Sequence, residues 1–70
     1  MEDNTISDYR SRKGLTQQQL ANMLDIPRTT MSFYENKRMY PTLAMAEKLG
    51  KILDKTIGQL YSEDELKMIK

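Results

Sequence analysis

The sequence of 70 residues contains no cysteine, no histidine and no tryptophan. Without cysteine and histidine the chain has no disulfide and lacks the usual ligands of a structural zinc site, the two devices that often stabilise domains of this size. The same absences remove the side chains on which most nucleophilic catalysis depends, and no glycine-rich phosphate loop is present. We therefore expect no enzymatic activity, no metal and no cofactor, and a fold stabilised by helix packing, by dimerisation or by both.

Long apolar runs are also missing. No stretch approaches the roughly 20 apolar residues of a membrane span, and the first residues, Met-Glu-Asp-Asn, do not resemble a secretory signal. We therefore expect a cytoplasmic protein that does not bind membranes and has no small-molecule substrate. The six methionines are interpreted as core and interface residues rather than as metal ligands.

Charge is balanced overall but unevenly distributed along the chain. Eleven basic and ten acidic residues give a formal net charge of +1. The segment 9–51 carries eight basic and three acidic residues, whereas residues 1–8 carry three acidic residues and no basic one. A basic middle suits a surface that faces phosphates, but an ordinary solvated helical surface accounts for it equally well.

Apolar residues recur at helical spacing, and short turn signals separate the segments. The pattern predicts helices over about 5–13, 16–24, 27–36, 42–53, 56–61 and 62–69. Two segments begin with the pattern of a capping box, Thr16 with Gln19 and Ser62 with Glu65. The fourth helix is expected to bury Leu43, Ala46, Leu49, Ile52 and Leu53. No linker or repeat interrupts this order, so we expect one domain over residues 1–70, a compact all-α bundle of five to six helices.

The second and third predicted helices form the central motif. They are short, a turn of about three residues separates them, and the small side chain of Ala21 permits a close crossing. Asp25 occupies the turn position that often needs a positive φ, which aspartate tolerates better than most residues. These features predict a helix-turn-helix over about residues 16–36, a motif whose second helix enters the DNA major groove.

One set of residues occurs in the order and spacing of a known family: Arg10, Lys-Gly-Leu-Thr-Gln from Lys13 to Gln17, Leu20-Ala21, Leu24, Ile26, Tyr34-Glu35-Asn36, Pro41-Thr42-Leu43 and Leu53. Through these residues the chain resembles the Cro/CI-type (XRE-like) DNA-binding domains over about residues 6–61. The resemblance implies a lambda-repressor-like domain that binds operators as a dimer, as in small phage and plasmid repressors.

The resemblance also implies a set of phosphate contacts. By this match Gln17 binds a phosphate at the start of the second helix, where helix N-termini favour anions. Asn36 and the following Lys37-Arg38 loop are similar to the family's second phosphate clamp, and Thr42 caps the next helix beside it. Lys37 stands where the family usually has glycine, so a residue with a Cβ must adopt the tight conformation, at a cost of about 1 kcal/mol.

Two further positions are matched inside the domain. Arg10 and Glu35 resemble the family's interior ion pair, which ties the first helix to the end of the recognition helix; the alternative is two separate surface charges. Pro27 stands where serine or threonine is usual, which removes one helix cap and one possible phosphate contact.

The outward face of the third helix is the candidate for base contacts. With Met31 and Tyr34 inward, periodicity leaves four residues outward, namely Arg28, Thr29, Ser32 and Phe33. Arg28 can donate two hydrogen bonds to guanine, and the methyl or hydroxyl group of Thr29 can meet a base edge. A thymine methyl contact accounts for an exposed Phe33. The alternatives are that Phe33 turns into the core and that Arg28 contacts phosphate or solvent.

A single domain of this size contacts too few base pairs for genome-scale specificity, and two-fold dimers on two half-sites solve that problem. We expect a homodimer formed by the C-terminal helices, about 56–69, through Ile57, Leu60, Tyr61, Leu66 and Ile69. The predicted function is a transcription regulator, most simply a repressor, on a palindromic operator in double-stranded DNA. The alternative is a protein-interaction module or antitoxin-like partner with the same fold.

Overall fold

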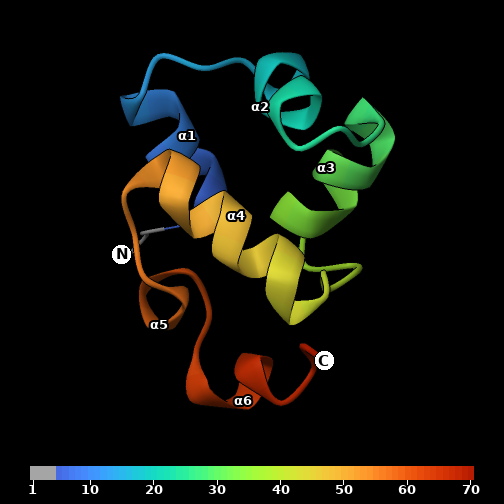
Figure 1. Ribbon diagram of the computed structural model, residues 1–70, viewed down its shortest axis with the longest axis vertical. Helices are drawn as coiled ribbons and strands as arrows, with labels where there is room; N and C mark the ends of the chain where they lie inside the picture. Colours follow the sequence, from blue (N-terminus) through green and yellow to red (C-terminus); the bar gives the residue numbers. More distant parts are fainter. Residues whose placement is uncertain (1–4) are drawn as a thin grey trace.

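The computed structural model describes residues 5–70 (Figure 1). Residues 1–4, which contain two of the N-terminal acidic residues and the start of the predicted domain, lie outside this part. The described residues form six helices and no strand: α1 (Ile6–Arg12), α2 (Gln17–Met23), α3 (Arg28–Glu35), α4 (Leu43–Leu53), α5 (Ile57–Leu60) and α6 (Glu63–Leu66). The predicted all-α fold is confirmed.

Local sequence sets the start of most helices. Thr5, Thr16, Thr56 and Ser62 are each the N-cap of a capping box, in which the cap side chain accepts a hydrogen bond from a backbone N–H three residues later and the side chain there bonds back. Pro27 precedes α3 and supplies no side-chain cap, as its chemistry requires. The helices therefore begin where the sequence predicts, within one residue.

Left-handed residues end three of the helical segments and shape the central turn. Asp25, between α2 and α3, has a φ of 59°, and Lys37, after α3, has a φ of 60°. Both left-handed conformations were predicted, that of Asp25 from its position in the turn and that of Lys37 from the family resemblance. Asp54 ends α4 with a φ of 58°, which the pattern did not predict, and Gly14 follows α1 with a φ of 74°.

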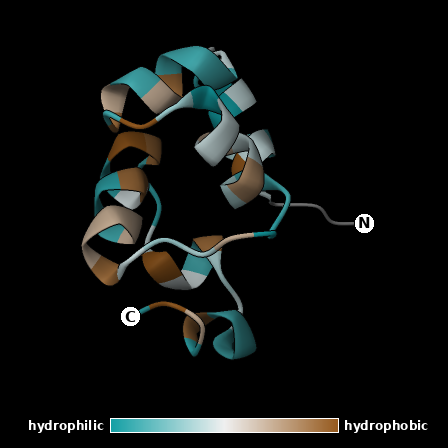
Figure 2. Ribbon diagram, turned by 90° about the vertical axis from the view of Figure 1, so that its right-hand side faces the viewer, coloured by the Kyte–Doolittle hydropathy of each residue, from teal (hydrophilic) through white to brown (hydrophobic). Residues whose placement is uncertain are grey.

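The core lies between the helix-turn-helix and α4, the longest helix, which runs through the centre of the molecule (Figure 1). Ala21 is fully buried at the crossing of α2 and α3. Each longer helix carries both apolar and polar positions (Figure 2), as expected of a helix with one buried face. The other buried apolar residues are Ile6, Tyr9, Leu20, Leu24, Met31, Tyr34, Ala46, Leu49, Leu53, Leu60 and Tyr61.

Two predictions for the C-terminal half are wrong. Leu43 is 49% exposed, because it is the first residue of α4 and lies before the part of the helix that enters the core. The last helix ends at Leu66 rather than reaching Ile69. Beyond it the chain turns back, and the carbonyl of Lys70 accepts a hydrogen bond of 2.7 Å from the N–H of Leu43, one of the N–H groups that a helix start leaves unpaired.

Within residues 5–70, no helix combines the length and apolarity that crossing a membrane requires.

Candidate nucleic-acid interface

Helix α3 presents one buried and one exposed face. Met31 and Tyr34 are buried, while Arg28 and Thr29 are exposed and Ser32 is half-buried. Phe33 is 43% exposed, so the alternative in which it turns into the core is excluded. The four candidate base-contacting residues therefore share an accessible face.

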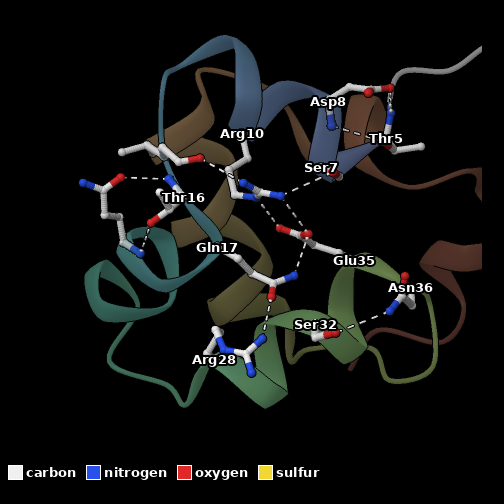
Figure 3. A network of polar contacts seen from close by, with 12 residues as sticks. Thr5, Ser7, Asp8, Arg10, Thr16, Gln17, Arg28, Ser32, Glu35 and Asn36 are labelled. Atoms are coloured by element: carbon white, nitrogen blue, oxygen red, sulfur yellow. Dashed lines mark hydrogen bonds and ion pairs between the residues drawn. The ribbon is translucent and has the colours of Figure 1, made fainter.

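The predicted interior pair lies behind α3. The Nε of Arg10 donates to Oε2 of Glu35 at 2.7 Å, and its Nη2 donates to Oε1 at 3.3 Å (Figure 3). A third donor, Nη1, bonds the carbonyl of Leu15 at 2.9 Å. The side chains of Arg10 and Glu35 are only 15% and 5% exposed. The pair is therefore a desolvated tie between α1 and the last turn of α3, and the alternative of two separate surface charges is excluded.

Gln17 extends this network to the exposed face. Its Nε2 donates to Oε1 of Glu35 at 3.0 Å, and its Oε1 accepts from Nη1 of Arg28 at 3.1 Å (Figure 3). Both ends of the Gln17 amide are thus engaged within the protein. Among the described residues the Arg28 guanidinium makes this one hydrogen bond, through Nη1, and Arg28 is exposed. Gln17 was expected at a phosphate, and this bridge between Glu35 and Arg28 was not predicted.

The loop after α3 begins with a Schellman turn. The N–H of Lys37 bonds the carbonyl of Tyr34 at 3.2 Å, and that of Arg38 bonds the carbonyl of Phe33 at 2.9 Å. Asn36 and Arg38 are exposed on this turn. Thr42 caps α4 through its hydroxyl, which accepts from the N–H of Met45 at 3.2 Å. Three of the expected phosphate ligands therefore lie along one exposed loop at the end of α3.

Lys37, another expected phosphate ligand, makes contacts within the protein. Its ammonium is 3.1 Å from Oε2 of Glu65, 3.4 Å from the carbonyl of Leu60 and 4.5 Å from the centre of the Tyr61 ring. These three groups belong to α5, α6 and the residues between them. From its left-handed backbone, the Lys37 side chain reaches residues 60–65 rather than the exposed turn that carries Asn36 and Arg38.

The groups around Lys37 have shifted acidities. Burial raises the pKa of Tyr61 far above its ordinary value of 10.0, with smaller contributions from Tyr34 and Glu65. Burial also opposes the charge of Glu65, but hydrogen bonds from the Ser62 N–H and the Lys37 ammonium hold the pKa of Glu65 below its ordinary value of 4.5. Near neutral pH, Lys37 therefore faces a neutral phenol and an ionised carboxylate.

The predicted dimer residues divide into two groups. Leu60 and Tyr61 are only 3% and 2% exposed; they belong to the core of one chain and offer almost no surface to another, because α5 packs against α4. Ile57, Leu66 and Ile69 are half-buried. The prediction of Leu60 and Tyr61 as contact residues is corrected accordingly.

The sequence is similar to a family model and to several known proteins. A helix-turn-helix family model matches residues 6–60. The HTH-type transcriptional activator BcrR of Enterococcus faecalis is 36% identical over 61 residues, which are 87% of this chain but 30% of that protein. The chain therefore spans less than a third of that activator. An uncharacterized HTH-type transcriptional regulator of Archaeoglobus fulgidus is 30% identical over 60 residues, 86% of each chain.

A solved structure is also similar. The crystal structure of a hypothetical transcription factor, NHTF, from Neisseria superposes with a TM-score of 0.70 at 31% sequence identity. The similarity covers 89% of this chain and 72% of that one.

Proposed function

This chain belongs to the XRE-type helix-turn-helix family of DNA-binding transcription regulators, and from that membership we propose that it binds a palindromic operator as a homodimer and represses transcription. The observation that carries the proposal is the position of Arg28. Arg28 is exposed at the start of α3, and its Nη1 donates to Oε1 of Gln17 at 3.1 Å. An arginine so oriented meets guanine O6 and N7 with little loss of side-chain freedom.

The base contacts are proposed for Arg28, Thr29, Ser32 and Phe33, and the phosphate contacts for Asn36, Arg38 and Thr42. All of these residues are exposed except half-buried Ser32, which supports the assignment, because groove and backbone contacts both need accessible side chains. Gln17 contributes in this proposal by holding Arg28, since both ends of its amide are engaged.

The proposed dimer uses the end of the molecule where the C-terminus meets α4. Leu43 and Met68 are 49% and 58% exposed, and the Lys70–Leu43 hydrogen bond brings the last residues to the start of α4 (Figure 1). Half-buried Leu66 and Ile69 add apolar surface. One chain measures 28 × 25 × 20 Å, so two chains joined at this end are large enough to set their α3 helices about 34 Å apart, one turn of DNA.

Repression is proposed because it needs no contact beyond the DNA: a bound dimer covers the site that RNA polymerase would use. The relative named as an activator is more than three times as long as its matching part. Its name therefore does not decide the direction of regulation for this chain.

The test is selection of bound duplexes from a random pool by the purified protein, followed by sedimentation of the protein free and on the selected site. We expect an inverted repeat and two chains per site. Leu43→Glu should lower both the fraction of dimer in sedimentation and the affinity for the selected site. Selection of a single, unrepeated half-site by a monomer would overturn the dimer and the palindrome. Enrichment of no duplex would favour the protein-interaction module instead.

A further inference from the structure

Lys37 and the C-terminal segment, residues 60–70, form a contact that the function proposed above does not use. The Lys37 ammonium bonds Glu65 and the Leu60 carbonyl and lies over the Tyr61 ring. Its side chain and that of Glu65 are each 28% exposed, so water screens the pair only in part. An ammonium that meets a carboxylate, a carbonyl and an aromatic face at once is well satisfied inside the protein.

We propose that Lys37 is a positioning residue for binding to two half-sites, because it holds the C-terminal segment in a fixed relation to the end of α3. The proposal rests on the homodimer proposed above, since that segment carries Leu66, Met68 and Ile69 of the dimer surface. Lys37 directly follows the C-cap of α3. A contact at this residue therefore links the base-contacting helix to the dimer surface through a single side chain.

The C-terminal segment needs such a contact. Helix α6 has four residues and buries none of them fully, and a helix of that length is not stable by itself. Among the described residues, polar contacts hold the part of the segment after Tyr61 to the rest of the chain at two places: Lys37 bonds Glu65, and the N–H of Leu43 bonds the carbonyl of Lys70 at the end. Loss of the first leaves the residues after Tyr61 attached by their far end and by partial burial of Leu66 and Ile69, while Leu60 and Tyr61 stay buried in the core.

The backbone at Lys37 supports the same assignment. A non-glycine residue with a φ of 60° is strained, and a lysine bound at its tip loses side-chain entropy. The contacts of the ammonium offset both effects, and the carboxylate of Glu65 is the one charged partner among them. Because glutamine has the same backbone restriction as lysine, Lys37→Gln isolates the charge from the strain.

The first experiment needs neither DNA nor a dimer. The amide hydrogens of Leu66, Met68 and Ile69 donate to backbone carbonyls at 2.9, 2.9 and 3.2 Å, and their exchange with solvent reports opening of the segment. We expect exchange roughly tenfold faster in Lys37→Gln and in Glu65→Gln, and unchanged in the control Arg38→Gln. Unchanged exchange in both variants would overturn the proposal, whatever the protein binds.

The second experiment compares a duplex with two half-sites and a duplex with one. Lys37→Gln and Glu65→Gln are expected to weaken binding to the two-site duplex by roughly tenfold and to leave one-site affinity and its salt dependence unchanged. The double variant should be no worse than either single variant, since both break one contact. Arg38→Gln should weaken both duplexes and lower the salt slope by about one.

Two results would overturn the proposal here. If Lys37→Gln behaves like Arg38→Gln, Lys37 is a phosphate ligand. If amide exchange accelerates in Lys37→Gln but affinity for the one-site and two-site duplexes falls equally, the contact stabilises the C-terminal segment without positioning it for binding to two half-sites. Failure of the operator selection itself would be a failure of the proposed function and would leave the exchange result interpretable. Should Lys37→Gln not fold, Glu65→Gln carries both measurements.

Discussion

The guanidinium of Arg10 meets the carboxylate of Glu35 through two hydrogen bonds, and this pair joins α1 to the last turn of α3. Glu35 also accepts from Gln17, whose carbonyl oxygen in turn holds Arg28. A buried ion pair thus lies two contacts away from the residue proposed to meet a base. The pair therefore supports the contacts that orient Gln17 and Arg28 as well as the fold.

Removal of one partner of this pair should be severe. We expect Arg10→Met to lower the free energy of unfolding by about 3 kcal/mol, because it leaves the Glu35 carboxylate, 5% exposed, without its main counter-charge. The double variant Arg10→Met with Glu35→Leu should be less destabilised than the worse single variant, since no charge is then stranded. Urea unfolding followed by circular dichroism measures all three. Equal losses below about 1 kcal/mol in every variant would contradict a desolvated pair.

Arg28 should discriminate between bases. Arg28→Ala is expected to lose about 1–3 kcal/mol of preference at one G·C pair in each half-site, while affinity for random duplex changes little. Arg28→Lys keeps the charge without the planar pair of donors and should lose most of the same preference. Titrations against the operator and its single-base variants, at two salt concentrations, provide the measurement. An equal loss on every duplex would make Arg28 a phosphate contact.

The two helical glycines should respond in opposite directions to alanine. A Cβ on Gly50 would lie 2.5 Å from the backbone carbonyl oxygen of Lys55, and a backbone atom cannot easily move away. We expect Gly50→Ala to lower the free energy of unfolding by about 1–3 kcal/mol. Gly58 is the matched control, because its Cβ would meet nothing closer than 3.9 Å. Gly58→Ala should be neutral or stabilising by up to about 1 kcal/mol, and thermal unfolding compares the two.

The charge of Glu65 should stabilise the fold near neutral pH and lose this effect in acid. Since the pKa of folded Glu65 lies below its ordinary value of 4.5, the stabilisation is complete above that value and is lost as the pH falls through the folded pKa. Glu65→Gln keeps the capping box with Ser62 and removes the charge. The melting temperatures of the two proteins should differ near neutral pH and converge in acid. A difference that is the same at every pH would contradict a role for the charge.

The sequence alone determined most of the secondary structure and the central motif. The capping box of Thr16 with Gln19 and the left-handed turn at Asp25 are formed by atoms within a few residues of each other, so local residue types suffice to predict them. Periodicity likewise predicted the outward Phe33. The family resemblance identified the Arg10–Glu35 pair, whose partners are 25 residues apart, because spacing within a known fold substitutes for the missing coordinates.

The tertiary structure decided which partner each long polar side chain takes. Gln17 reaches Glu35 across 18 residues and Arg28 across 11, and Lys37 reaches Glu65 across 28. A lysine or glutamine has several rotatable bonds, so its residue type and position leave its direction open. Burial of Leu60 and Tyr61 and the end of α6 at Leu66 were likewise decided by packing on α4 and by the hydrogen bond from Leu43 to Lys70. All of these contacts form between segments that meet only after the chain has folded. A local sequence pattern therefore does not predict which partner a flexible polar side chain takes.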